Sequence, residues 1–239
     1  MRIESDFGSF DCFEPSAPAA PYAVLHLRDR LDASPADNPS LTSALEERSL
    51  RVCSPAIESC WWVNLECTRF AHAVAPFAWL RSAAVEQVTQ MWGVAARQIG
   101  LLGTGIGGHG ALHLAYRHPR EFPVVAAIAP AVDIHSHYDR DAILQDVFPN
   151  AEAARQETAT LHIHPLNWPP HQWFACDPLD PDWYEGCERL ASKLSSIGIF
   201  FESDLTTSAG GRRDDYERMM LPKAVEFVAN GLQKVSAAS

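Results

Sequence analysis

The stretch 98–119 constrains the fold more than any other part of this sequence. An apolar run over 98–102 leads into a glycine-dense turn over 103–110, and an amphipathic segment follows that ends before Pro119. Glycine allows close backbone contact and left-handed turns, and proline ends helices. The pattern predicts a buried strand over 98–102, a tight turn, and a helix over 111–117.

Short apolar runs alternate with segments of helical spacing along the rest of the chain. Strands that are apolar throughout, separated by helices, are typical of a mostly parallel sheet covered on both faces. We expect a single domain over 1–239, in which 133–172 leaves the alternation and passes over the carboxyl edge of the sheet, where sites form in such folds. The other expected strands are 22–27, 50–55, 124–129, 173–176 and 198–202, and the other expected helices are 41–50, 83–92, 183–194 and 221–232.

Composition excludes several classes of function. The net charge of −11 argues against nucleic-acid or anionic-membrane partners. No apolar run reaches the roughly 18 residues of a membrane span, and the N-terminus has no apolar signal core. The six cysteines contain no C-x-x-C pair, so we expect reduced thiols in a cytoplasmic protein.

The alternation and the glycine-dense turn resemble an α/β-hydrolase, and more narrowly the esterase branch that includes esterase D and S-formylglutathione hydrolase. GTGIGGHGAL over 103–112 resembles the branch's G-x-S-M-G-G-Y/H-G-A-L, and HPREF over 118–122 its H-P-x-x-F. SCWWVN over 59–64 is similar to its Ser-x-Trp-Tyr segment. The resemblance covers roughly residues 20–235.

The resemblance also implies positions for a catalytic triad. Gly105 stands where the G-x-S-x-G elbow has its serine nucleophile, and Arg212 stands where the base loop has histidine. The acid maps to Asp180, with Asp177 as a second candidate. Glycine has no side chain to attack with, and arginine has no acceptor for a proton. We therefore expect a non-catalytic binding or assembly protein; the alternative is an active carboxylic-ester or thioester hydrolase with a water- or metal-activated mechanism.

The N-terminus of the helix after Gly105 is expected to favour anions, because its backbone N–H groups are unpaired. Gly105, Ile106 and Arg212 are the candidate residues for a small anionic ligand, and a homo-oligomer is the other partner considered. Leu27 stands where the branch has a glycine near its oxyanion hole. The N-terminal part looks shorter than the branch's pair of leading strands.

Two other motifs are weighed and set aside. H-x-H-x-D over 135–139 is similar to a metallo-β-lactamase motif, but Arg140 replaces its closing histidine. We expect no metal, and His135 and His137 are the candidates if one binds. The turn 103–108 matches G-x-G-x-x-G, but no acidic residue follows at the spacing a dinucleotide needs, so no cofactor is expected.

Overall fold

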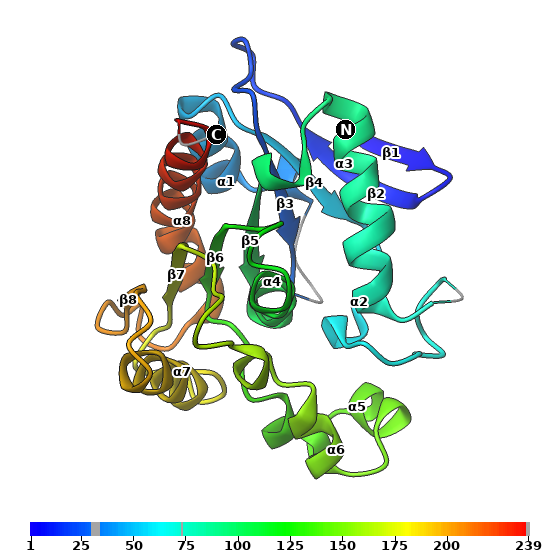
Figure 1. The fold of residues 1–239 in the computed structure, drawn as a ribbon, viewed down its shortest axis with the longest axis vertical. Helices are drawn as coiled ribbons and strands as arrows, with labels where there is room; N and C mark the ends of the chain where they lie inside the picture. Colours follow the sequence, from blue (N-terminus) through cyan, green and yellow to red (C-terminus); the bar gives the residue numbers. More distant parts are fainter. Residues whose placement is uncertain (30–33, 73, 238–239) are drawn as a thin grey trace.

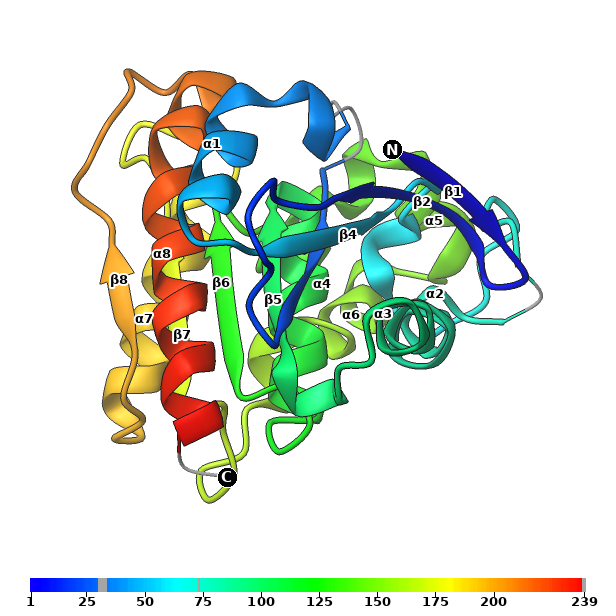
Figure 2. The same ribbon diagram turned by 90° about the horizontal axis from the view of Figure 1, so that it is seen from above.

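The computed structural model describes residues 1–29, 34–72 and 74–237. Within these residues, eight strands form one sheet in the order β1-β2-β4-β3-β5-β6-β7-β8 (Figures 1 and 2). Neighbouring strands from β4 to β8 are parallel, and the pairs β1–β2 and β2–β4 are antiparallel. The strands are β1 (Arg2–Ser5), β2 (Gly8–Phe13), β3 (Ala23–Leu27), β4 (Arg51–Pro55), β5 (Ile99–Thr104), β6 (Val124–Ile128), β7 (His171–Ala175) and β8 (Glu202–Asp204).

Helices cover both faces of the central strands. A Cβ on Gly100 would overlap Val228 of α8, whereas a Cβ on Gly103 would overlap the backbone of Gly107 in α4. Residues an odd number apart in a strand point to opposite faces, so α8 and α4 cover opposite sides of β5. The expected α/β-hydrolase fold, mostly parallel with helices on both faces, is confirmed. The helices are α1 (Pro39–Glu47), α2 (Pro76–Trp79), α3 (Val85–Trp92), α4 (Gly105–Arg117), α5 (Ala142–Val147), α6 (Ala151–Gln156), α7 (Tyr184–Ser196) and α8 (Arg213–Ala237).

A hairpin of two leading strands, β1 and β2, precedes the parallel part of the sheet. Our expectation of an N-terminal part shorter than such a pair of leading strands is therefore wrong. β1 alternates exposed and half-buried residues, so it has no apolar run that would identify it in the sequence. Arg2 pairs with Asp11 across the hairpin, and Arg2 Nε lies 2.9 Å from Asp11 Oδ1. The polar sequence of β1 is the reason that the hairpin could not be recognised in the sequence.

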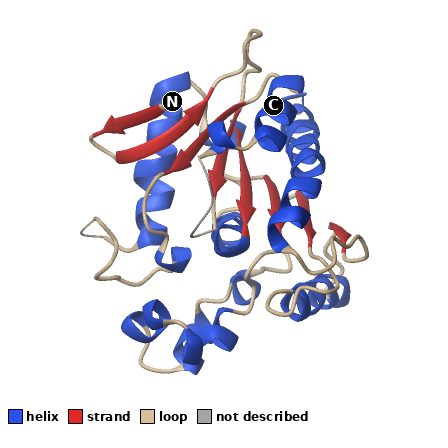
Figure 3. Cartoon of the chain, turned by 180° about the vertical axis from the view of Figure 1, so that it is seen from behind, coloured by secondary structure: helices blue, strands red, loops and turns tan. Residues whose placement is uncertain are grey.

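Between β6 and β7 the chain leaves the sheet. The 3₁₀ helix Ile134–Arg140, α5 and α6 lie beyond the carboxyl ends of the central strands (Figures 1 and 3). The assignment of 1–239 to a single domain stays a prediction. In the part of the chain that the structure describes, no helix is both long enough and apolar enough to cross a membrane.

Candidate functional site

The turn between β5 and α4 places Gly105 at the carboxyl edge of the sheet. Gly105 has φ +52°, in the left-handed region that a residue with a side chain adopts only at a cost. α4 begins at Gly105, not at residue 111, because the glycines of the turn already belong to the helix. The local geometry is the sharp strand-to-helix turn that the sequence predicts.

The Asp29 carboxylate fills the space beside Gly105. A Cβ on Gly105 would lie 2.5 Å from both Cγ and Oδ2 of Asp29. The Ile106 N–H donates to Asp29 Oδ1 at 3.3 Å, and the Asp29 N–H donates to Thr104 Oγ1 at 3.2 Å. The amino end of α4 stabilises a negative charge at this place. The Asp29 carboxylate thus occupies the place at the amino end of α4 where we expected an anionic ligand.

Sequence reasoning missed Asp29, although a signal for it exists. Asp29 closely follows β3, a buried strand that pairs in parallel with β5, with Leu27 opposite Gly103. The carboxyl ends of neighbouring parallel strands lie side by side, so an acidic residue after β3 belongs to the edge that carries Gly105. Leu27 itself is fully buried, and its carbonyl oxygen would overlap a Cβ on Gly107. That close crossing of β3 and α4 requires glycine at 107.

Asp177 ties the loop after β7 to the loop before α8. Its carboxylate accepts hydrogen bonds from Ser208 Oγ at 2.7 Å and from the N–H groups of Ala209 and Gly211 at 2.7 and 3.0 Å. Burial raises the pKa of Asp177, but hydrogen bonds from Leu179, Ser208, Ala209 and Gly211 lower it by more, so the net pKa is below the ordinary value. These contacts fix the conformation of the loop before α8.

Asp180 pairs with Arg213 and not with Arg212, the residue that the sequence places at the base position. Arg213 Nε lies 3.2 Å from Asp180 Oδ2, whereas Arg212 Nε lies 2.8 Å from Asp215 Oδ2. The Arg212 side chain is 77% exposed and the Asp180 side chain 3%. The loop residues Gly210 and Gly211 both have left-handed φ values, +73° and +74°, and this double turn directs Arg212 outward.

Arg213 is the cation that contacts Asp180. Burial lowers its pKa, but the hydrogen bond and charge of Asp180, the charge of Asp29 and a hydrogen bond to Asp182 raise the pKa by more. Its guanidinium also lies over the Trp183 ring, 5.1 Å from the centroid. The charges of Asp180 and Asp29 therefore act on one guanidinium, which lies against the Trp183 ring.

The His137 ring packs against two tryptophan rings near Arg213. Its ring centroid lies 4.2 Å from that of Trp183 and 6.0 Å from that of Trp61. Burial, and then the charge of Arg140, lower the pKa of His137. Among the residues described, neither His135 nor His137 belongs to a group of three possible ligands within reach of one ion.

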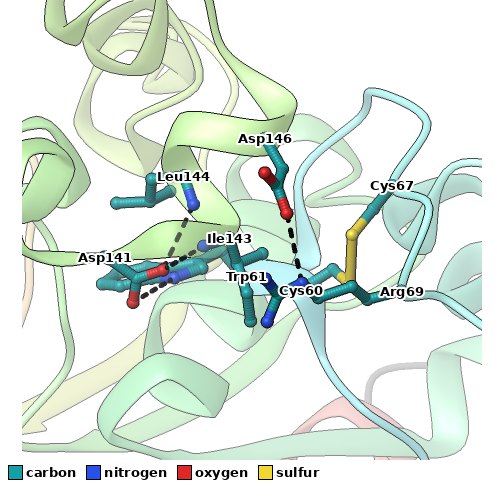
Figure 4. Close-up of a disulfide and its surroundings, with 8 residues drawn as sticks. All are labelled: Cys60, Trp61, Cys67, Arg69, Asp141, Ile143, Leu144 and Asp146. Carbon is teal, nitrogen blue, oxygen red and sulfur yellow. Dashed lines mark hydrogen bonds and ion pairs between the residues drawn. A yellow bond between two sulfur atoms is a disulfide. The ribbon is translucent and has the colours of Figure 1, made fainter.

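A disulfide joins Cys60 to Cys67 beside the site (Figure 4). Our expectation of reduced thiols is wrong for this pair; Cys12, Cys53, Cys176 and Cys187 are free and buried. The cytoplasmic location rested on that expectation and stays a prediction. The loop holds Trp61, whose Nε1–H donates to Asp141 Oδ2 at 3.2 Å, and Asp141 in turn caps the amino end of α5.

A polar cleft of about 240 Å³ adjoins Asp29. Arg28, one of its cations, lies 3.1 Å from Asp11 through Nη2 and Oδ2. Charges of both signs therefore border the site. The lining residues are Arg2, Arg28, Asp29, Pro55, Ala56, Ile57, Glu58, Ser59 and Trp62.

Comparison with known proteins places this geometry in a family. A family model described as "Putative esterase" matches residues 79–230, more than half of the 239 residues. FphF, a fluorophosphonate-binding serine hydrolase from Staphylococcus aureus, superimposes with a TM-score of 0.77 at 12% identity, covering 96% of this chain and 97% of that one. An S-formylglutathione hydrolase from Agrobacterium tumefaciens gives 0.77 at 14% identity, with 97% and 94% covered.

The S-formylglutathione hydrolase FrmB from Staphylococcus aureus gives a TM-score of 0.72 at 12% identity, covering 96% of this chain and 97% of that one. At such identities the structures share the fold, and the family model carries the assignment. Among curated protein sequences none matches. The chain belongs to the esterase family that the matching model describes, on the α/β-hydrolase fold.

Proposed function

We propose that this member of the family does not carry out serine-dependent acyl transfer and serves instead as a binding or assembly protein. The observation that carries the proposal is the contact between Gly105 and Asp29. The residue at the strand-to-helix turn has no side chain, and the Asp29 carboxylate takes the space that a serine would need. Acyl transfer on this fold uses a nucleophile at that turn.

The base position supports the same proposal. Whether the family's histidine corresponds to Arg212 or to Arg213, an arginine stands there, and a guanidinium has no lone pair with which to accept a proton. Arg213 is in contact with Asp180, the acid of the proposed vestigial triad. The pair keeps the acid and replaces the base with a permanent cation.

The proposed ligand is a small carboxylate or phosphate. In the fold's chemistry the N–H after the nucleophile stabilises an oxyanion, and here the Ile106 N–H donates to Asp29. A ligand anion would compete with Asp29 for that N–H, next to Gly105 and with Arg213, not the exposed Arg212, as the nearby cation. Assembly with a second copy of the chain is the other role the proposal includes.

A second candidate is a hydrolase that activates water. The observation that favours it is again Asp29, because a carboxylate beside the turn is a possible general base. Its hydrogen bond from Ile106 N–H weighs against this role, since Oδ1 is already occupied by that contact and is not free to bind a water.

An esterase assay separates the two candidates. We expect the purified chain to hydrolyse p-nitrophenyl acetate and an acyl thioester no faster than buffer, and to remain unlabelled by a fluorophosphonate probe that labels an active family enzyme run in parallel. Turnover that disappears in Asp29→Asn would favour the water-activated hydrolase. Turnover blocked by the fluorophosphonate would contradict both candidates, and turnover lost on chelation would indicate a metal-activated mechanism.

A further inference from the structure

A second cluster of chemically active side chains lies at the far end of α4, away from Gly105. Among the described residues, His113, Glu157 and His162 are the group whose ligand atoms lie within 4.8 Å of one another. They come from three separate places: His113 from α4, Glu157 from the end of α6, and His162 from the 3₁₀ helix Ala159–His162. The inference drawn from them is independent of the proposed function.

His113 presents a lone pair to this cluster. Its ring is fully buried, and its Nδ1 lies 3.4 Å from the Trp62 carbonyl oxygen. A carbonyl only accepts, so Nδ1 carries the proton and Nε2 carries the lone pair. His113 Nε2 has no hydrogen-bond partner among the described residues, and its nearest ionic neighbour is Glu157 Oε2 at 4.0 Å. That distance is too long for a hydrogen bond.

His162 Nε2 is also an acceptor, but it already has a donor. The Arg117 guanidinium donates to His162 Nε2 at 2.9 Å. A guanidinium only donates, so His162 Nε2 is an acceptor as well. The rings of His113 and His162 stack with centroids 4.8 Å apart. A ring nitrogen of each histidine therefore lies within 4.8 Å of a carboxylate oxygen of Glu157.

Glu157 is held in place by a donor of its own. The Asn64 N–H donates to Glu157 Oε2 at 3.1 Å, and the Trp62 carbonyl oxygen likewise orients His113 by accepting from its Nδ1. Such outer contacts orient metal ligands in proteins. We propose that His113, Glu157 and His162 bind one divalent transition-metal ion of the Zn²⁺ class through two imidazole nitrogens and one carboxylate.

The cluster has to contract to hold an ion, because its ligand atoms lie within 4.8 Å of one another. Ligand atoms about 2.0–2.2 Å from a tetrahedral Zn²⁺ lie roughly 3.4 Å apart, so the 4.0 Å between His113 Nε2 and Glu157 Oε2 has to shorten by about half an ångström. Glu157 is 17% exposed and His162 is half-buried, so an ion can enter from their side. The remaining coordination positions would be taken by water.

Arg117 is the competing cation. Its Nη2 contacts Glu157 Oε1 at 3.3 Å as well as His162 Nε2, so it stabilises the cluster when no metal is bound. Metal binding has to displace this guanidinium, and the affinity is accordingly lower than that of a dedicated structural site.

Titration of the tag-free, chelator-treated full chain with Zn²⁺ tests the proposal. We expect one equivalent to bind by calorimetry, and Co²⁺ to give visible absorption bands of a low-coordinate site. Glu157→Gln and His162→Gln should each weaken Zn²⁺ binding at least about tenfold. His164→Gln, an exposed histidine two residues from His162, is the matched control and should bind as the unaltered chain does.

Arg117→Met should bind Zn²⁺ more tightly, because it removes the competing cation. Circular dichroism of each variant shows first that it folds, and the Co²⁺ spectrum of the unaltered chain tests the site without any substitution. No saturable Zn²⁺ binding, or binding unchanged in both Glu157→Gln and His162→Gln, would overturn the proposal. Unchanged affinity in Arg117→Met would overturn the part assigned to Arg117.

Discussion

At the scale of single residues, the site is defined by side chains that meet from separate strand ends. Gly105 could be placed from the sequence because its turn is a local pattern of strand, glycine and helix. Asp29 could not, because its contact with Gly105 depends on the pairing of β3 with β5. Arg213 could not be told from Arg212, because the two left-handed glycines before them decide which side chain points inward.

Replacing Gly105 with serine should lower stability more than the backbone alone explains. A side chain at φ +52° costs about 1–3 kcal/mol, and the new Cβ would also displace Asp29. Gly93→Ser is the matched control, because Gly93 has φ +66° and nothing within 4 Å of an added Cβ. Urea unfolding should give a lower midpoint for Gly105→Ser than for Gly93→Ser, and Asp29→Ala should recover the difference. Equal midpoints would contradict the contact.

Removing Arg213 should leave a buried carboxylate without its cation. Asp180 retains hydrogen bonds from the N–H groups of Asp182 and Trp183, so we expect Arg213→Ala to cost about 1–3 kcal/mol and no more. The exposed Arg212→Ala should cost under about 1 kcal/mol. Free energies of unfolding measure both, and Asp180→Asn should restore part of the loss in Arg213→Ala. A larger loss for Arg212→Ala than for Arg213→Ala would contradict the pairing.

At the scale of elements, apolar content decides which strands and helices can be predicted from the sequence. The buried strands β3, β4, β5, β6 and β7 follow from short, mostly apolar runs, and the main helices follow from their spacing. β1 and the short helices α5 and α6 lack such runs, since β1 is half solvated and α5 and α6 have six residues each. Their positions depend on pairing and capping contacts that only the folded chain supplies.

The loop closed by Cys60 and Cys67 should contribute measurably to stability. Closing a loop of this length restricts the unfolded chain by about 2–3 kcal/mol, so reduction with a phosphine should lower the urea midpoint accordingly. Thiol titration of the denatured chain should count four thiols before reduction and six after it. Cys67→Ser should be insensitive to the reductant, and a count of six before reduction would contradict the disulfide.

At the scale of the whole molecule, the order of the strands could not be predicted. β3 lies between β4 and β5, and the leading hairpin extends the sheet beyond β4. Interchangeable apolar strands fit several orders, and only the way the helices cross between them selects one. Fold class could be predicted from the sequence because it depends on the kind of elements and on their alternation. Both are set by short stretches of sequence.

Stability of the whole fold should fall below neutral pH because His26 is buried in β3 without a hydrogen-bond partner among the described residues. Burial, and then the charge of Arg28, lower its pKa from 6.5 to about 3. The unfolded chain therefore binds a proton that the folded chain does not. The free energy of unfolding is unaffected by His26 above pH 6.5. It falls by about 1.4 kcal/mol per pH unit as the pH decreases from there toward 3.

Urea midpoints between pH 7 and pH 5 test this dependence. His26→Leu removes the group that titrates and keeps an apolar side chain in the sheet, so its midpoint should change less with pH than that of the unaltered chain. The same slope in both proteins would show that His26 does not titrate as expected.

The contact between Gly105 and Asp29 also governs how such a chain can evolve. A serine at 105 would have to displace the Asp29 side chain, so the residue at 29 sets the stability cost of any side chain at 105. A change at either position therefore alters what the other position tolerates. Among related sequences we expect serine at position 105 to occur with a residue other than aspartate at position 29.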